Sequence, residues 1–282
     1  MSKTLKKIKE TKEYIYKKIS SSPDFAIVLG SGYSNFSKEV EDPIFIDYED
    51  IPNFPKTTIK GHQGKLIFGK INGKKVIILS GRFHYYEGHK IKKVIFPIRV
   101  FHALGVKNLI LTNASGGVRK GLKVGDIMII NDHINFMPAH PLHGPNMEEL
   151  GPRFVSMNEP YDMDMIELAE KIMKEKGISY HKGIYFGLQG PSFETPAEYN
   201  MVGILGAAIV GMSTVSETIT AKHMGMKVFA LSVVTDIGGD AYAEFYDKGQ
   251  KENVVSHEEV LEAAKEAMPK VTTLLKEFIK SY

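Results

Sequence analysis

The sequence contains no cysteine, little excess charge and no long apolar run. Without cysteine, disulfides, thiolate metal sites and cysteine nucleophiles are excluded. A net charge of +3 over 282 residues is too small to indicate a nucleic-acid partner. No apolar run approaches the length of a membrane span, and the charged N-terminal segment lacks the apolar core of a secretory signal. We therefore expect a soluble cytoplasmic protein without nucleic-acid or membrane partners.

Several common catalytic signatures are also missing or incomplete. GSG at residues 30–32 lacks the third glycine of the dinucleotide-binding fingerprint, and no acid ends a strand about twenty residues later. The chain has no Walker lysine, no nucleophile elbow and no Ser-His-Asp order. These absences argue against a nicotinamide-dependent dehydrogenase, a P-loop protein and a hydrolase with a catalytic triad.

Short apolar runs alternate with helix patterns along the chain. The pattern predicts helices at 3–18, 93–104, 162–176 and 216–223 and a last helix from 256, which Pro269 would kink or divide. Buried strands are expected at 25–29, 66–68, 76–79, 108–112, 126–130 and 228–234. No repeat or linker interrupts residues 1–282. The prediction is a single α/β domain with a mixed, largely buried sheet flanked by helices.

Polar turns follow the apolar strands, at 30–32, 81–84, 113–114, 212–213 and 235–236. Ligand contacts in α/β proteins gather at such strand ends. In the first turn, exposed N–H groups and the Ser31 hydroxyl suit a phosphate. In the second turn, Arg82 offers the fork of donors that phosphate prefers. An ion pair with a nearby carboxylate is the alternative explanation of Arg82.

Histidines and large side chains offer further ligand contacts. The candidate donors are His62, His84 and His257, and the candidates for packing on a sugar or ring are Tyr86, Phe193 and Met212. A methionine at a strand end is more often part of the core.

A metal site is not expected. His133, His140 and His143 lie close together in the sequence, but no carboxylate accompanies them at a typical spacing. A catalytic zinc site needs three placed protein ligands, so we put a metal there at about one in ten.

Two glutamates flank the start of a helix at residue 195. Thr195, Pro196 and Glu198 match an N-terminal cap, a first-turn proline and the third position of a capping box, which gives Glu198 a structural role. Glu194 lies in the preceding loop and has no such role. A loop acid is often merely solvated, and the alternative is that Glu194 contacts a ligand.

An anion site, an arginine, apolar surfaces and two separate acids together suit a nucleoside and phosphate. Breaking an N-glycosidic bond leaves cationic character on the ribose and negative charge on the base. Phosphate beside C1′ stabilises the first, and a donor at purine N7 stabilises the second. Glu194 and Asp236 would hold the polar leaving group.

The motifs resemble those of the low-molecular-mass, homotrimeric purine nucleoside phosphorylases. They are GSG at 30–32, GHQGKLIFG at 61–69, GRFHYYEG at 81–88, TNASGG at 112–117, GPSFETPAE at 190–198 and VGMST at 210–214. The resemblance runs along essentially the whole chain. It implies an α/β fold whose mixed sheet forms a distorted barrel, a trimer with active sites near subunit interfaces, and inorganic phosphate as co-substrate without a cofactor.

The resemblance also implies a role for each matching residue. Phosphate would be bound by Ser31, His62, Arg82, His84, Ala114 and Ser213. Ribose would be bound by Tyr86, Met212, His257 and Phe154, the last lent by a neighbouring subunit. The base would be bound by Tyr185, Phe193, Glu194, Val210, Gly211 and Asp236, and His84, Glu194 and Asp236 would be the catalytic residues.

Asp236 departs from the family pattern, because members specific for 6-oxopurines have asparagine there. An amide both donates and accepts, whereas a carboxylate only accepts, which suits the amino group of adenine and opposes O6. A protonated Asp236 could donate instead, and burial near Glu194 would raise its pKa. Glu194 favours a base with a proton on N1, so the two acids favour different purines.

We therefore expect a phosphorylase for inosine and guanosine that accepts adenosine better than relatives with asparagine do. Methylthioadenosine phosphorylases have aspartate at this position, but they lack a glutamate at position 194 and the GRFH motif, and His257 favours a hydroxyl over a methylthio group. A non-catalytic nucleoside-binding protein of the same fold is the other alternative.

Overall fold

The computed structural model describes residues 2–58, 63–238 and 256–282. The helices are α1 (Lys3–Ile19), α2 (Ile91–Val94), α3 (Phe96–Ala103), α4 (Met163–Glu175), α5 (Pro196–Ile204), α6 (Val215–His223) and α7 (His257–Ser281), with short 3-10 turns at Ser34–Glu39, Tyr48–Asp50 and Tyr85–Glu87. The strands are β1 (Phe25–Leu29), β2 (Glu41–Asp47), β3 (Lys65–Ile71), β4 (Lys74–Ser80), β5 (Asn108–Gly117), β6 (Ile127–Asn135), β7 (His181–Gly187), β8 (Ile209–Gly211) and β9 (Lys227–Ile237).

One mixed sheet contains all these strands, in the order β2-β3-β4-β1-β5-β8-β7-β6-β9. Strand β9 also pairs with β5, so that β5, β8, β7, β6 and β9 close into a five-stranded barrel. The barrel-like mixed sheet expected from the family resemblance is thereby confirmed.

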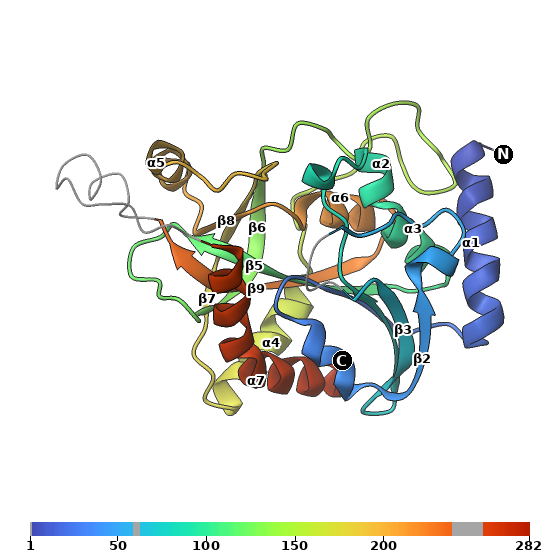
Figure 1. The fold of residues 1–282 in the computed structure, drawn as a ribbon, viewed down its shortest axis with the longest axis horizontal. Helices are drawn as coiled ribbons and strands as arrows, with labels where there is room; N and C mark the ends of the chain where they lie inside the picture. Colours follow the sequence, from blue (N-terminus) through green and yellow to red (C-terminus); the bar gives the residue numbers. More distant parts are fainter. Residues whose placement is uncertain (1, 59–62, 239–255) are drawn as a thin grey trace.

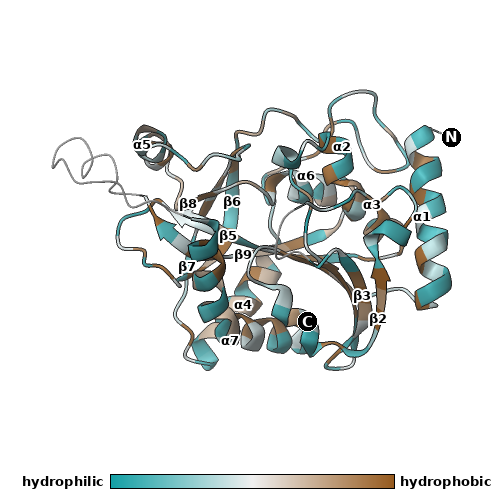
Figure 2. Cartoon of the chain, in the orientation of Figure 1, coloured by the Kyte–Doolittle hydropathy of each residue, from teal (hydrophilic) through white to brown (hydrophobic). Residues whose placement is uncertain are grey.

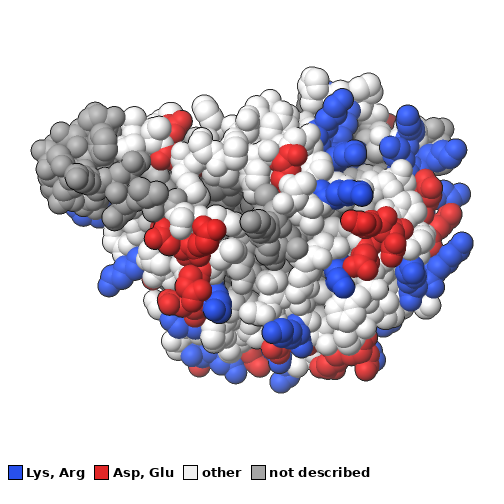
Figure 3. All heavy atoms as spheres, viewed as in Figure 1, with Lys and Arg blue, Asp and Glu red and all other residues white. Residues whose placement is uncertain are grey.

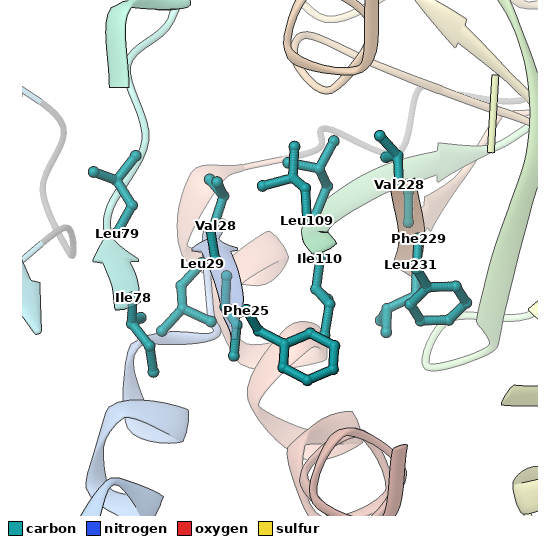
Figure 4. Packing of buried hydrophobic residues seen from close by; sticks show 14 of the residues in the cluster. Phe25, Val28, Leu29, Ile78, Leu79, Leu109, Ile110, Val228, Phe229 and Leu231 are labelled. Atoms are coloured by element: carbon teal, nitrogen blue, oxygen red, sulfur yellow. The ribbon is translucent and has the colours of Figure 1, made fainter. Parts of the chain in front are cut away.

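The core lies along four parallel neighbours, β4, β1, β5 and β9. All five residues of β1 are buried, because side chains on both faces of the strand are covered. Figure 4 shows how apolar side chains from the four strands pack in rows, among them Val28, Ile78, Ile110 and Leu231. This rigid centre fixes the strand ends that carry the polar turns.

Helices cover the sheet on both sides. In Figure 1, α4 and α7 lie on one side of the strands, and α2, α3 and α6 lie on the other. Figure 2 shows hydrophobic residues along the central strands and hydrophilic ones on the outward sides of α1 and α7. Phe278 of α7 stacks on Phe229 of β9, with 4.9 Å between the ring centroids. Helix α7 also runs through Pro269 as a single element, so the helix is not divided there.

Other boundaries differ from the sequence prediction because of tertiary pairing. Strands β5 and β9 continue to Gly117 and Ile237, since residues 113–117 pair in parallel with residues 232–237 of the neighbouring strand. The helix expected at 93–104 is two helices, α2 and α3, with Pro97 in the first turn of α3. Strand β8 has only three residues, which is too short for a periodic signal.

Helix α5 begins as the sequence predicts. The Thr195 N–H donates to the Glu198 carboxylate at 2.8 Å, and the Glu198 N–H donates to the Thr195 hydroxyl at 3.2 Å. Both bonds satisfy backbone donors that lack a partner at a helix start.

We expect Glu198→Ala to lower the free energy of unfolding by about 1 kcal/mol, because one member of the capping box is lost. Urea denaturation measures this change. Glu175→Ala is the control, since Glu175 makes only an exposed pair with Lys171 at 3.9 Å and should change stability little. Equal, small effects of the two substitutions would contradict the capping role.

The surface shows no dominant charge on the face that Figure 3 draws, where Lys and Arg side chains lie among Asp and Glu side chains around its edge. Within the described ranges, none of the helices combines the length and the apolar composition needed to cross a membrane.

Candidate active site

A cavity of about 390 Å³ lies at the ends of the central strands. Its walls are formed by Ser31, Thr58, Arg82, His84, Tyr86, Asn113, Ala114, Ser115, Gly116, Pro191, Phe193, Glu194, Val210, Gly211, Met212, Ser213, Thr235, Asp236, His257 and Val260. Because β1, β4, β5 and β9 are parallel, the turns after the first two strands reach the same edge of the sheet as the last residues of β5 and β9. The loops around α5 and β8 and the start of α7 complete the walls.

The turn after β1 needs its glycines. A Cβ on Gly30 would lie 2.7 Å from the Thr112 carbonyl oxygen, so a side chain there would push the turn away from β5. Gly32 has a φ of +85°, and a Cβ on it would collide with Ala264 of α7. The two glycines therefore place Ser31 in the cavity wall while α7 packs directly against the turn.

Arg82 is almost fully buried and held on several sides. Its Nε and Nη2 donate to the two carboxylate oxygens of Glu217 at 3.3 and 2.8 Å, and its Nη1 donates to the Thr112 carbonyl at 2.6 Å. Nη1 also lies 3.2 Å from the Ser213 hydroxyl. The side chain thus lines the cavity and forms the ion pair with a carboxylate that the sequence offered as the alternative, while its role in binding phosphate stays a prediction.

Ser213 belongs to a network around the start of α6. Its N–H donates to the Tyr185 hydroxyl at 3.1 Å, and the next residue, Thr214, has a φ of +69°. That uncommon conformation is held because the Thr214 N–H donates to Glu217 at 3.1 Å and the Asn113 amide donates to the Thr214 hydroxyl at 2.8 Å. Strained residues fixed by several partners are frequent at functional sites.

His84 lies on the turn after β4, the same turn that carries Arg82. Its N–H and its Nδ1 lie 2.8 and 3.0 Å from one oxygen of Glu87, and its ring stacks on Tyr86. The other oxygen of Glu87 accepts from the N–H and the hydroxyl of Thr58, each at 2.8 Å. Burial opposes ionisation of Glu87, but these bonds outweigh it and lower its pKa to about 2. Burial lowers the pKa of His84, and Arg82 adds to this effect while Glu87 opposes it.

Two carboxyl groups lie in another part of the cavity. Burial raises the pKa of Glu194 to about 7, and the charges of Asp236 and Glu198 contribute to the shift. Burial also raises the pKa of Asp236, while hydrogen bonds from Tyr199 and Thr235 work against it. A cavity with perturbed acids beside a buried arginine is a typical setting for catalysis.

The structure brings most of the sequence-predicted site residues together. The residues in the cavity wall are Ser31, Arg82, His84, Tyr86, Ala114, Phe193, Glu194, Val210, Gly211, Met212, Ser213, Asp236 and His257.

Three predicted residues are not among the described residues of the cavity wall. Tyr185 is fully buried behind Gly211, where a Cβ on the glycine would collide with the tyrosine hydroxyl. Phe154 is 88% exposed and does not line the cavity of this chain. His62 lies outside the described residues. The roles assigned to all the site residues stay predictions.

Sequence reasoning gave no role to several residues of the site. In the wall these are Thr58, Asn113, Ser115, Gly116, Pro191, Thr235 and Val260. Behind the wall, Glu217 pairs with Arg82, Glu87 with His84, and Tyr199 with Asp236. The capping-box spacing Thr214–Glu217 is a signal for Glu217, whereas Tyr199 shows only as a buried aromatic residue on α5.

His133, His140 and His143 are not joined by acids into a metal-binding group. Within residues 2–58, 63–238 and 256–282, no cluster of three or more potential metal-ligating side chains occurs. Nδ1 of His133 lies 3.1 Å from the Tyr161 hydroxyl.

Comparison with known proteins connects this geometry to a family. The model of the phosphorylase superfamily matches residues 24–280. Purine nucleoside phosphorylase 1 of Bacillus subtilis (strain 168) is 42% identical over 276 residues, which are 98% of this chain and 98% of that protein. Purine nucleoside phosphorylase of Rattus norvegicus is 42% identical over 273 residues, which are 95% and 92% of the two chains.

Solved structures agree with the sequence relatives. The crystal structure of Schistosoma mansoni purine nucleoside phosphorylase in complex with adenosine has a TM-score of 0.91 and 38% identity, and the alignment covers 98% of this chain and 97% of that one. The complex of the Schistosoma mansoni enzyme with inosine has a TM-score of 0.90 and 38% identity, covering 99% and 97%.

Proposed function

Since the chain belongs to the purine nucleoside phosphorylases of the phosphorylase superfamily, we propose that its cavity performs the phosphorolysis of purine nucleosides. The products would be the free base and ribose or deoxyribose 1-phosphate, as in purine salvage. The observation that carries the proposal is that one cavity holds a buried arginine with two serines and also a pair of acids with raised pKa values.

The basic part of the cavity suits phosphate. Ser31, Arg82 and Ser213 offer two hydroxyls and a guanidinium, and His84 and the backbone N–H of Ala114 lie in the same wall. A phosphate oxygen held there forms a bond to C1′ of the nucleoside while the bond from C1′ to N9 breaks. The electron pair of the broken bond goes to the purine, which takes up a proton at N7 from water or from a protonated Asp236. Fixed donors on phosphate orient it for this step.

The ribose would lie against Tyr86 and Met212. Nε2 of His257, at the start of α7, is buried and has no hydrogen-bond partner among the described residues. Burial without a partner is costly, and a ligand hydroxyl would satisfy this nitrogen. The 5′-hydroxyl of a nucleoside is the group we assign to it.

The base would lie between Phe193 and the wall of Val210 and Gly211. An ionised Glu194 accepts from the N1–H of hypoxanthine or guanine. Asp236 accepts from a 6-amino group when it is ionised and donates to N7 or O6 when it is protonated. We infer that inosine and guanosine are substrates and that adenosine is accepted as well. The relative from Schistosoma mansoni has been solved with both adenosine and inosine.

The test is the release of free base from inosine, guanosine, adenosine and methylthioadenosine, with and without phosphate. We expect release only with phosphate, and fastest from the 6-oxopurine nucleosides. A strong preference for methylthioadenosine would contradict the role of His257. Nucleoside binding without any release of base would support a non-catalytic protein of the same fold.

A trimer would complete the site. Phe154 is exposed although it is large and apolar, and the Arg153 guanidinium lies over its ring at 5.8 Å from the centroid. Contact with the ribose site of a second copy would cover it. We therefore propose a cytoplasmic homotrimer in which each cavity receives Phe154 from a neighbour.

We expect Phe154→Ala to raise the KM for inosine about tenfold, because one buried aromatic contact is lost, and to leave the KM for phosphate unchanged. Steady-state kinetics measure both constants. Phe45→Ala is the control, since Phe45 is 55% exposed on β2 and does not line the cavity. A fully active monomer in sedimentation would contradict the assignment.

A further inference from the structure

Tyr199 lies behind the acidic part of the cavity. It is on α5, its side chain is 6% exposed, and its hydroxyl donates to Oδ2 of Asp236 at 2.7 Å. A Cβ on Gly116 would collide with that hydroxyl, and a Cβ on Gly238 would collide with the ring. Two glycines thus leave the space that the tyrosine occupies.

The hydrogen bond from Tyr199 favours the ionised form of Asp236. Oδ2 accepts from Tyr199, and Oδ1 lies 3.1 Å from the Thr235 hydroxyl, which also lies 3.3 Å from the Ser115 carbonyl. Asp236 and Thr235 line the cavity, whereas Tyr199 does not. Tyr199 therefore acts on a bound base through the acids that it hydrogen-bonds, Asp236 at 2.7 Å and also Glu194.

We propose that Tyr199 is a positioning residue that holds Asp236 as an ionised acceptor and thereby determines how well the cavity accepts 6-aminopurine nucleosides. The inference rests on the proposed phosphorolysis of purine nucleosides. An acceptor fixed by Tyr199 matches the amino group of adenine, while the same acceptor opposes O6 of hypoxanthine.

The electrostatics around Asp236 support this geometry. Among the described residues, the titratable groups that face it are Tyr199 from α5 and Glu194 from the preceding loop, and Glu198 acts on Glu194. Burial raises the pKa of Asp236, and the Tyr199 hydrogen bond opposes that rise. Without the hydroxyl, the pKa of Asp236 rises further, and the protonated carboxyl becomes a donor that suits O6.

The experiment compares wild type with Tyr199→Phe, which keeps the ring between the two glycines. The ratio of kcat/KM for adenosine to kcat/KM for inosine should fall about tenfold, the effect of about one pKa unit at a coupled group. The acidic limb of the adenosine pH profile, which reports ionisation of Asp236, should move to higher pH. Tyr161→Phe is the matched control, because it removes the hydroxyl of a buried tyrosine that contacts His133 and not Asp236. It should leave the ratio unchanged.

A double-variant cycle isolates the coupling. In an Asp236→Asn background, the carboxylate of Asp236 is absent and Tyr199 can act only on Glu194, so Tyr199→Phe should change the ratio much less than it does in wild type. If Tyr199→Phe lowers both efficiencies equally and leaves the pH profile in place, Tyr199 has only a structural role and the inference is wrong.

The proposed function is tested separately by wild type. If wild type releases no base in the presence of phosphate, the proposed phosphorolysis is wrong. Calorimetric measurement of adenine and hypoxanthine binding then still tests the role of Tyr199. Tyr199→Phe should then weaken adenine about tenfold relative to hypoxanthine, and an unchanged ratio of affinities would overturn the inference. Thermal unfolding of each variant shows whether it is folded at the assay temperature.

Discussion

Replacing Arg82 with methionine is expected to lower the catalytic efficiency with phosphate by about 100- to 1000-fold. Arg82 is the one Lys or Arg side chain in the described cavity wall, and removal of one preorganised donor from a developing charge has effects of this size. Initial rates of inosine cleavage over a range of phosphate concentrations measure the change.

The single substitution also leaves Glu217 buried without its partner, which costs about 3–5 kcal/mol of stability. The double variant Arg82→Met, Glu217→Gln separates the two effects, since glutamine removes the unpaired buried charge and keeps an acceptor for the Thr214 N–H. We expect it to unfold near the wild-type temperature and to remain as inactive as the single variant. Recovery of activity together with stability would contradict a direct role of Arg82 at phosphate.

Substrate preference is expected to change with pH around 7. The pKa of Glu194 is raised from 4.5 to about 7, so the carboxyl is mostly protonated at pH 6 and mostly ionised at pH 8. The ionised form accepts from N1–H of hypoxanthine, and the protonated form donates to the bare N1 of adenine. Over these two pH units each efficiency changes about tenfold, in opposite directions, so the inosine-to-adenosine ratio rises about 100-fold.

Measured pH profiles of kcat/KM for the two nucleosides test this expectation. Glu194→Gln is the control, because an amide does not titrate, and it should lower the efficiency with inosine while flattening the ratio between pH 6 and 8. A ratio that stays constant in wild type over this range would contradict the role of Glu194. The raised pKa also determines the direction of a pH effect on stability. The folded state binds the Glu194 proton more tightly than the unfolded state does. The contribution of Glu194 to the free energy of unfolding therefore decreases as the pH rises from about 4.5 to 7.

Much of the cavity could be predicted from the sequence, because its residues follow strand ends. Apolar runs followed by polar turns mark Ser31, Arg82 and Asp236 without any knowledge of the fold, and parallel strands bring such turns to one edge. Capping chemistry alone distinguishes the role of Glu198, in the first turn of the helix, from that of Glu194, in the preceding loop. The capping box at α5 confirms the structural role of Glu198.

The supporting residues could not be predicted in the same way. Glu217 lies 135 residues from Arg82 in the sequence, and Tyr199 lies 37 residues from Asp236. Their pairing depends on the closure of the barrel through β5 and β9, which no local pattern contains. The sequence pattern ends β5 and β9 too early for the same reason. Pairing between these two neighbouring strands overrides the turn preference of residues such as Gly116 and Gly117.

The ion pair between Arg82 and Glu217 would affect how readily the product dissociates from the cavity. A buried arginine without a counter-charge would bind ribose 1-phosphate as tightly as phosphate. Slow dissociation of ribose 1-phosphate would then limit the turnover rate. With both carboxylate oxygens of Glu217 on the guanidinium, the positive charge offered to an incoming anion is already partly balanced. We therefore expect the buried glutamate to weaken the binding of anions by Arg82 and to speed product release.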